Sequence, residues 1–216
     1  MAAHQHSEGA EGLSKHRIEA LSDGIFAFAM TLLVLDLKIP HQPDLSAASG
    51  SLGQTVLALW PKFLSYFMSF VVLGVYWIAH HSYAHFLKRT DRWLLWCNLL
   101  FLMFVVLVPF STDLLGDYPR HKVAVIIYGA NFVALGLAFY LQWWYATSGH
   151  RLVGRELEPE VVHRGRRRML GGVAVYSCAA LLALVNPTLS LILYVAIPLF
   201  FIFPSRIDHH WTHSHG

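Results

Sequence analysis

An arginine, a serine and an aspartate stand at the entrance to the first apolar segment of this chain, as Arg17, Ser22 and Asp23. The residues that follow, 25–35, are apolar except for Thr31. Ionisable side chains at the depth of a membrane are costly, and they usually mark a path for ions or a binding site. A charged entrance that leads into an apolar helix therefore indicates a membrane protein whose first helix carries function.

A helical wheel separates two sides of this first segment. Phe28, Leu32 and Leu35 follow the spacing i, i+4, i+7 and form one stripe at 100° per residue. Asp23 lies about 140° from Phe28, so a stripe that faces a pore or a partner leaves Asp23 facing the bundle interior. There the carboxylate needs a partner, either Arg17 or a group on another span. Two simpler interpretations remain open: ordinary apolar packing of the stripe, and a capped, anchored helix start at the cytoplasmic surface.

Three histidines, His80, His81 and His85, end the second apolar segment. The spacing of His81 and His85 puts them on one helix face, where they form a workable metal pair. A membrane metalloenzyme needs several more ligands, and the other histidine clusters lie in the terminal tails, so we expect neither a metal nor an enzyme. We expect His80 or His81 to serve instead as a hydrogen-bond partner for Asp23 or Ser22 inside the bundle.

The composition is that of an integral membrane protein. Of the 216 residues, 56% are hydrophobic and 13% are charged, against roughly 25% charged residues in a soluble domain. The mean hydropathy is +0.47. No nucleotide motif, phosphate-binding loop or nucleic-acid signature occurs in the chain. A span needs about 20 apolar residues, which predicts an all-α fold of six transmembrane helices over residues 18–38, 54–87, 93–115, 122–147, 167–185 and 188–204.

The basic residues are distributed unequally between the two sides of these predicted spans. Most lie before the first span, between the second and third, between the fourth and fifth, and after the sixth. The positive-inside rule therefore places both termini in the cytoplasm of a multi-pass protein of the cell membrane. We expect a disordered cytoplasmic tail over residues 1–16, one membrane domain over 17–205, and a histidine-rich cytoplasmic tail over 206–216.

The motifs together resemble those of a known family of membrane proteins. The first segment resembles the signature Arg-x-x-x-Phe-Ser-Asp of the transmembrane protein 175 family, which includes the lysosomal potassium channel of animals and single-repeat prokaryotic relatives. The matching strings are Arg17-x-x-x-Leu21-Ser22-Asp23, Trp77-x-x-His80-His81, Asn98-Leu-Leu-Phe-Leu and Pro109-Phe-Ser111-Thr112. The resemblance is close over the first three spans, whereas the last three agree in number and length.

This resemblance implies a potassium-selective channel of the bacterial type, a homotetramer in the lipid bilayer with its pore lined by the first helix. The implied constriction is an apolar ring at Phe28, Leu32 and Leu35, which acts as a hydrophobic gate in place of a carbonyl filter. Thr31 next to it either helps to coordinate potassium or bonds a backbone carbonyl one turn back. Potassium is then the permeant ion, with no cofactor and no nucleic acid.

The resemblance also implies a buried polar network that fixes the first helix against the next two. Its expected members are Arg17, Ser22, Asp23, Trp77, His80, His81 and Asn98. The chain departs from the family pattern at two positions, with Leu21 for the motif phenylalanine and Phe28 for the usual isoleucine of the constriction, so the narrowest ring stays open. The alternative function is a proton-coupled secondary transporter or a proton leak through Asp23 and the histidines. A transporter would show inverted repeats, which we do not find.

Overall fold

The computed structural model describes residues 2–38 and 52–202, and the side chains of 15–38 and 52–197. Over these ranges the fold is all-helical and contains no strand. The helices are α1 (Ala2–Leu35), α3 (Leu52–Ala58), α4 (Trp60–Phe86), α5 (Arg92–Asp117), α6 (Lys122–Thr147), α7 (Pro159–Leu182) and α8 (Pro187–Ile202), with a short 3-10 turn, η1, at Ser148–His150.

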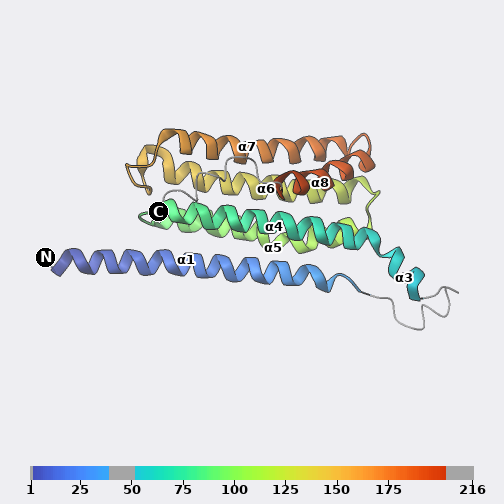
Figure 1. Ribbon diagram of the computed structural model, residues 1–216, viewed down its shortest axis with the longest axis horizontal. Helices are drawn as coiled ribbons and strands as arrows, with labels where there is room; N and C mark the ends of the chain where they lie inside the picture. The colour runs from blue at the N-terminus through green and yellow to red at the C-terminus, as the bar shows by residue number, and fades with distance from the viewer. Residues whose placement is uncertain (1, 39–51, 203–216) are drawn as a thin grey trace, which may run out of the picture.

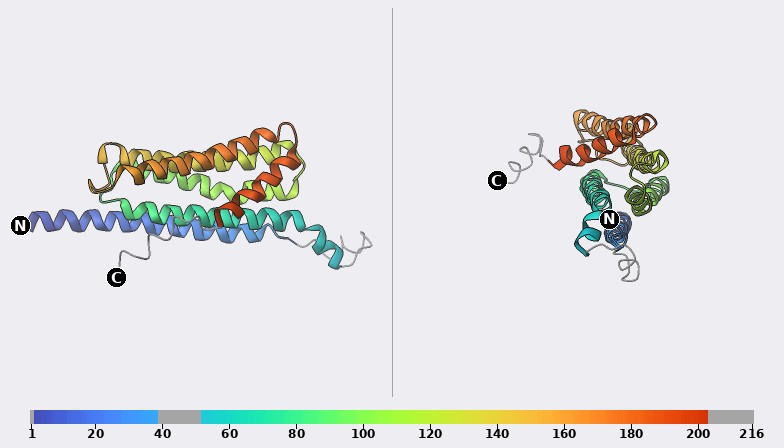
Figure 2. Two further views of the ribbon diagram at one scale, coloured as in Figure 1. Left: turned by 45° about the horizontal axis from the view of Figure 1, so that its top comes forward. Right: turned by 90° about the vertical axis from the view of Figure 1, so that its right-hand side faces the viewer.

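The long helices run side by side along one axis, and α1 lies at the edge of the bundle (Figure 1). One face of α1 packs on α4 and α5, α5 packs on α6, and α6 packs on α7. The shorter α8 crosses the bundle obliquely and contacts α4, α6 and α7 (Figure 2). Among the described residues, no helix other than α4 and α5 packs extensively on α1, and its opposite face stays uncovered by them.

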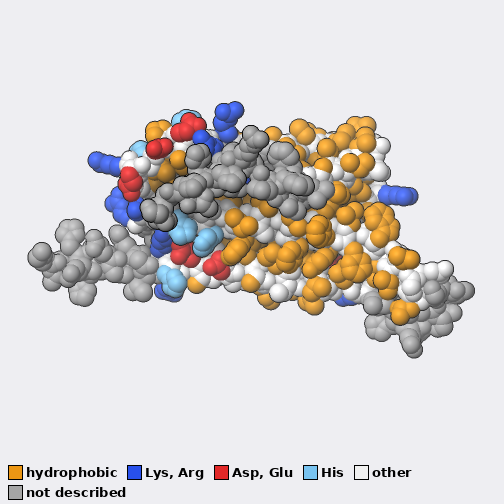
Figure 3. All heavy atoms as spheres, in the orientation of Figure 1, with side chains coloured by type: hydrophobic (Ala, Val, Ile, Leu, Met, Phe, Trp, Pro, Cys, Tyr) orange, Lys and Arg blue, Asp and Glu red, His pale blue; other side chains and the backbone are white. Residues whose placement is uncertain are grey.

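Four helical segments are long and apolar enough to cross a membrane: Lys15–Leu35, Trp60–Phe86, Arg92–Asp117 and Lys122–His150. In Figure 3 apolar side chains are spread over the middle and right of the described surface, whereas most of the charged and histidine side chains in view gather at the left end. This distribution is the one expected of a membrane protein. The first four predicted spans thus correspond to helices able to cross a bilayer, while the spanning role of α7 and α8 stays a prediction.

Two predicted spans have different boundaries in the structure. The segment 54–87 is not one helix, because the chain breaks at Leu59 between α3 and α4. Pro61 lies in the first turn of α4, where its missing N–H costs nothing and its fixed φ suits a helix start. The fifth helix begins at Pro159 rather than at residue 167, so its arginines are helical instead of belonging to a loop.

Of the two predicted tails, the structure describes the backbone of the N-terminal one only. Helix α1 already begins at Ala2, within the segment for which the sequence predicts a disordered tail. The predicted histidine-rich tail, 206–216, lies outside the described residues. The boundaries of the membrane domain stay a prediction.

An aromatic cluster joins α1, α4, α5 and α6 at the centre of the bundle. Phe101 of α5 is fully buried and lies 5.9 Å from Phe26 of α1, measured between ring centroids. The ring of Phe139 on α6 lies 5.2 Å from that of Phe101, and the His80 ring stacks on Phe101 at 5.4 Å with almost parallel planes. This packing fixes the imidazole of His80 in one orientation beside α1.

Candidate functional site

Helix α1 has two chemically distinct faces. The face toward α4 and α5 carries Ser22, Phe26, Ala29 and Leu33, each at most 1% exposed. Their spacing of four, three and four residues follows the helical repeat. This face is closed by packing and fixes the rotation of α1 about its own axis.

The opposite face of α1 is open in the single chain. Phe28 is 60% exposed and Leu35 is 61% exposed, and Thr31 is exposed between them. Leu32 lies at the border of the two faces and is half-buried. Large apolar side chains with this exposure need lipid, a partner or a dry pore to cover them.

The hydroxyl of Thr31 is already engaged within α1. Its Oγ1 donates a hydrogen bond to the carbonyl oxygen of Phe28 at 2.7 Å. This is the backbone bond that the sequence analysis held open against ion coordination. The two roles are compatible, because a hydroxyl has one proton to donate and two lone pairs with which to accept.

A buried hydrogen-bonded chain connects α1, α5 and α4. The Nδ2 atom of Asn98 donates to the Oγ atom of Ser22 at 3.2 Å, and Asn98 Oδ1 lies 3.0 Å from His80 Nε2. Since an amide oxygen can only accept, the proton of this second bond lies on His80 Nε2. All three side chains are at most 4% exposed, so water does not compete for these bonds.

A second polar contact lies at the outer edge of the same helices. The indole Nε1 of Trp77 donates to Asp23 Oδ1 at 2.8 Å, and the Trp77 ring stacks on His81 with centroids 6.0 Å apart. Asp23 is exposed in the single chain, so the prediction that it faces the bundle interior is wrong. The helical wheel predicts a buried side chain at Asp23, whereas the buried residue is its neighbour Ser22.

Six of the seven residues expected in one polar network are thus divided between two sets. Ser22, His80 and Asn98 are joined inside the bundle, and Asp23, Trp77 and His81 are joined at its edge. Arg17 is exposed and joins neither set within the described part of the chain. The partner of Asp23 therefore comes from α4 and not from Arg17, and Ser22 is linked to His80, not to His81.

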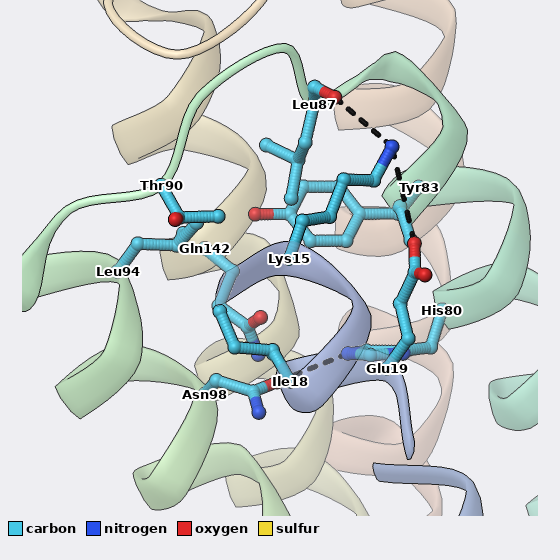
Figure 4. A pocket seen from close by; sticks show the side chains of 11 residues that line it. Lys15, Ile18, Glu19, His80, Tyr83, Leu87, Thr90, Leu94, Asn98 and Gln142 are labelled. Carbon is cyan, nitrogen blue, oxygen red and sulfur yellow. Dashed lines mark hydrogen bonds and ion pairs between the residues drawn. The ribbon is translucent and has the colours of Figure 1, made fainter. Parts of the chain in front are cut away.

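A small hollow opens beside the inner set, between α1, α4, α5 and α6 (Figure 4). At its rim, Lys15 Nζ donates to the carbonyl oxygen of Leu87 at 3.1 Å and lies 3.9 Å from Glu19 Oε1. Gln142 of α6 lines it and is only 1% exposed, yet both polar atoms of its amide lack a partner among the described residues. Sequence reasoning missed Gln142, although an isolated amide inside the fourth apolar segment is a usable signal.

A charged cluster lies at the other end of the bundle. Lys62 Nζ of α4 lies 2.5 Å from Asp117 Oδ1 and 3.7 Å from Asp113 Oδ1, both on α5. Asp36, the first residue after α1, is nearby, and desolvation together with the charge of Asp113 raises the pKa of its carboxyl above the ordinary value. The end of α1 is thus marked by a carboxylate beside an ion-paired lysine, a grouping that the sequence analysis did not identify.

Comparison with known proteins identifies relatives along most of the chain. The family model described as endosomal/lysosomal potassium channel TMEM175 matches residues 17–109. A potassium channel of Streptomyces collinus is 36% identical over 191 residues, which are 87% of this chain and 91% of that protein. The human endosomal/lysosomal proton channel TMEM175 is 35% identical over 188 residues, which are 83% of this chain but only 37% of the human protein.

A solved structure shares the whole architecture. The crystal structure of a lysosomal potassium-selective channel TMEM175 homologue from Chamaesiphon minutus has a TM-score of 0.78 and 32% identity, and the match covers 88% of this chain and 96% of that one. The likeness therefore extends well beyond the first three spans, which carry the sequence motifs. On this identity and coverage, together with the match of the family model to the first three spans, the chain belongs to the TMEM175 family of membrane channels.

Proposed function

We propose that this protein is a potassium channel: a homotetramer, with six membrane spans per chain, that conducts K⁺ passively through a pore lined by α1. The observation that carries the proposal is the open face of α1, on which Phe28, Thr31 and Leu35 remain exposed while the opposite face is locked into the bundle. The potassium channels of Streptomyces collinus and Chamaesiphon minutus are its supporting relatives.

Four copies of this open face around an axis would form a dry apolar neck. Phe28, Leu32 and Leu35 supply its rings, and an ion that passes them must shed part of its water shell with little replacement. K⁺ is more weakly hydrated than Na⁺, so its barrier is lower. A neck of this kind also closes by dewetting, which makes it a gate as well as a filter.

Thr31 is the polar group available to such a neck. Because its proton is directed to the Phe28 carbonyl, its oxygen lone pairs are free to face a cation. Four such hydroxyl oxygens would replace part of the lost hydration. We infer that Thr31 supports selectivity and that the apolar rings set the barrier.

The inner polar set would hold the pore helix at a fixed angle. The bonds from Ser22 through Asn98 to His80 attach α1 to α5 and α4 without using any residue of the open face. Buried hydrogen bonds of this kind specify one arrangement, since breaking them leaves desolvated polar atoms. The contact of Trp77 with Asp23 adds a second fixed point, one residue further along α1.

The proposed orientation places both termini in the cytoplasm of a cell membrane. The exposed arginines of the first turns of α7 and the basic residues between α4 and α5 would then lie at the cytoplasmic surface. The cluster of Lys62, Asp113 and Asp117 would lie at the outer surface. We propose no resident cofactor, with K⁺ as the permeant ion.

A second candidate is proton conduction by the same pore, favoured by the name of the human relative, a proton channel. Within the described residues Asp23 is bonded to Trp77 and not to His80, so the Asp–His relay of a proton-coupled carrier lacks its first link. A proton path would therefore follow water in the open pore.

The reversal potential of the reconstituted protein tests the proposal. Purified protein is placed in a planar bilayer with K⁺ on one side and Na⁺ on the other, at equal pH. We expect a current that reverses close to the K⁺ equilibrium potential. A reversal that instead follows an imposed pH gradient supports the proton candidate, and flux without ohmic current contradicts both channel readings.

A further inference from the structure

The histidine pair that ends α4 takes no part in the proposed pore or in the inner polar set. His81 and His85 lie one turn apart, and both are exposed in the single chain. Their rings turn toward each other, with Nε2 to Nε2 at 3.4 Å and an almost perpendicular arrangement of the planes. Histidine side chains gather beside carboxylates at this end of the molecule (Figure 3).

The distance between the two Nε2 atoms matches the separation of two nitrogen ligands on a tetrahedral metal ion. Zinc binds imidazole nitrogen at about 2.0–2.1 Å, and two such bonds at the tetrahedral angle place the nitrogens about 3.3–3.4 Å apart. The pair already has this separation, at 3.4 Å, and a metal would replace the proton between the two Nε2 atoms once each neutral ring carries its proton on Nδ1. Without a metal, one ring N–H donates to the other nitrogen.

We propose that His81 and His85 form an exchangeable binding site for a divalent transition-metal ion of the Zn²⁺ class. Imidazole nitrogen suits Zn²⁺, Cu²⁺ and Ni²⁺, whereas Mg²⁺ and Ca²⁺ require oxygen ligands. No group of three or more histidine, cysteine or acidic side chains is placed to hold a metal within the described ranges, so water completes the coordination. The ion is thus exchanged with solution and is not a resident cofactor.

The site is connected to α1 by direct contacts. The His81 ring stacks on Trp77, and the Trp77 indole N–H donates to Asp23 of α1. A metal that holds His81 therefore acts on the residue that fixes the outer edge of the first helix. This inference rests on side-chain geometry alone and is independent of which ion the pore conducts.

Zn²⁺ titration of the full-length protein by calorimetry tests the site. Tail histidines would add a background, so the reference chain carries glutamine at His4, His6, His209, His210, His213 and His215. We expect this reference chain to bind Zn²⁺, and we expect His85→Gln to weaken binding by more than about tenfold because half of the chelate is lost.

A matched control separates this site from general histidine binding. His163 is an exposed histidine on α7 whose Nδ1 lies 2.8 Å from the Pro159 carbonyl oxygen, and His163→Gln should leave the titration unchanged. Anomalous scattering at the zinc absorption edge should place one peak between the two Nε2 atoms. Unchanged binding in both His81→Gln and His85→Gln, or a peak elsewhere, would overturn the proposal.

Discussion

Asn98 donates a hydrogen bond from Nδ2 to Oγ of Ser22, 3.2 Å away, and this bond joins the first helix to α5 in a part of the bundle that water does not reach. Its amide oxygen meanwhile faces His80 of α4. A single side chain of α5 thus satisfies polar groups on two other helices. Asn98 thus ties the position of α1 to both α5 and α4.

Replacing Asn98 with leucine should destabilise the protein strongly. The change leaves the Ser22 hydroxyl and the His80 N–H without partners, at about 1–3 kcal/mol for each orphaned group. Thermal unfolding, followed by tryptophan fluorescence in detergent, measures the loss. Ser22→Ala removes one bond only and should cost less, and the double variant should show non-additive losses. A double variant whose losses simply add would mean that the two side chains act independently.

Shortening one leucine on each face of α1 should change different properties of the protein, the K⁺ current on the open face and the stability on the closed face. Leu35→Ala on the open face should raise the K⁺ current, because it widens the apolar neck, and should change the melting temperature little. Leu33→Ala on the closed face removes a side chain that is 1% exposed and should cost about 2–5 kcal/mol without widening the pore. Single-channel conductance and thermal unfolding of both variants provide the comparison. Equal conductance changes would contradict a pore on the open face.

Removing the hydroxyl of Thr31 while keeping its shape should reduce selectivity. Thr31→Val retains the volume and the apolar surface of the side chain but removes the oxygen available to a cation. We expect the reversal potential under K⁺/Na⁺ gradients to move toward zero, with assembly unaffected because the volume of the side chain is kept. Thr31→Ser, which keeps the oxygen, is the matched control. An unchanged reversal potential in Thr31→Val would remove Thr31 from the selectivity mechanism.

The carboxyl of Asp36 should make stability depend on pH in a definite direction. Burial and the charge of Asp113 raise its pKa in the folded protein, so folding favours the protonated form. The stability that the protonated Asp36 carboxyl contributes is complete below its ordinary pKa of about 3.8, which applies to the unfolded chain. It is lost as pH rises through the raised pKa of the folded protein. Asp36→Asn should therefore raise the melting temperature at neutral pH and leave it unchanged in acid.

The ion pair beside Asp36 provides a control of opposite sign. Asp117→Asn weakens the contact with Lys62 and should lower the melting temperature at neutral pH. The measurement is a series of thermal unfolding curves from acidic to neutral pH for both variants. A fall in the neutral melting temperature of Asp36→Asn would show that the carboxylate is paired and stabilising.

Gln142 should be replaceable by a methionine with a gain in stability. Its amide is buried with no partner among the described residues, and an apolar side chain of similar shape avoids the cost of that desolvation. We expect the melting temperature of Gln142→Met to rise. Leu135→Met, at another buried position of α6, controls for the substitution itself and should be close to neutral. A lower melting temperature for Gln142→Met would mean that water bonds to the amide in the hollow.

Several features follow from the sequence because they depend only on local composition and spacing. The hydropathy pattern identifies the four helical segments able to cross a membrane, since a span needs about 20 mostly apolar residues. Ser22, His80 and Asn98 are three of the seven residues that the motifs predict to form one polar network, and hydrogen bonds join these three in the structure. The order of apolar and polar positions also separates the stripe with Phe28 and Leu35 from the rest of α1.

Other features exist only in the folded chain, because they depend on the rotation and depth at which helices meet. A helix rotates by 100° per residue, so an error of one position exchanges a buried side chain for an exposed one, as with Ser22 and Asp23. The contact of Lys62 with Asp117 likewise joins residues far apart in the chain, and the Gln142 amide is buried only because neighbouring helices cover it. The sequence alone therefore determined which segments are helices and which family they form, while tertiary packing decided which face of α1 stays open.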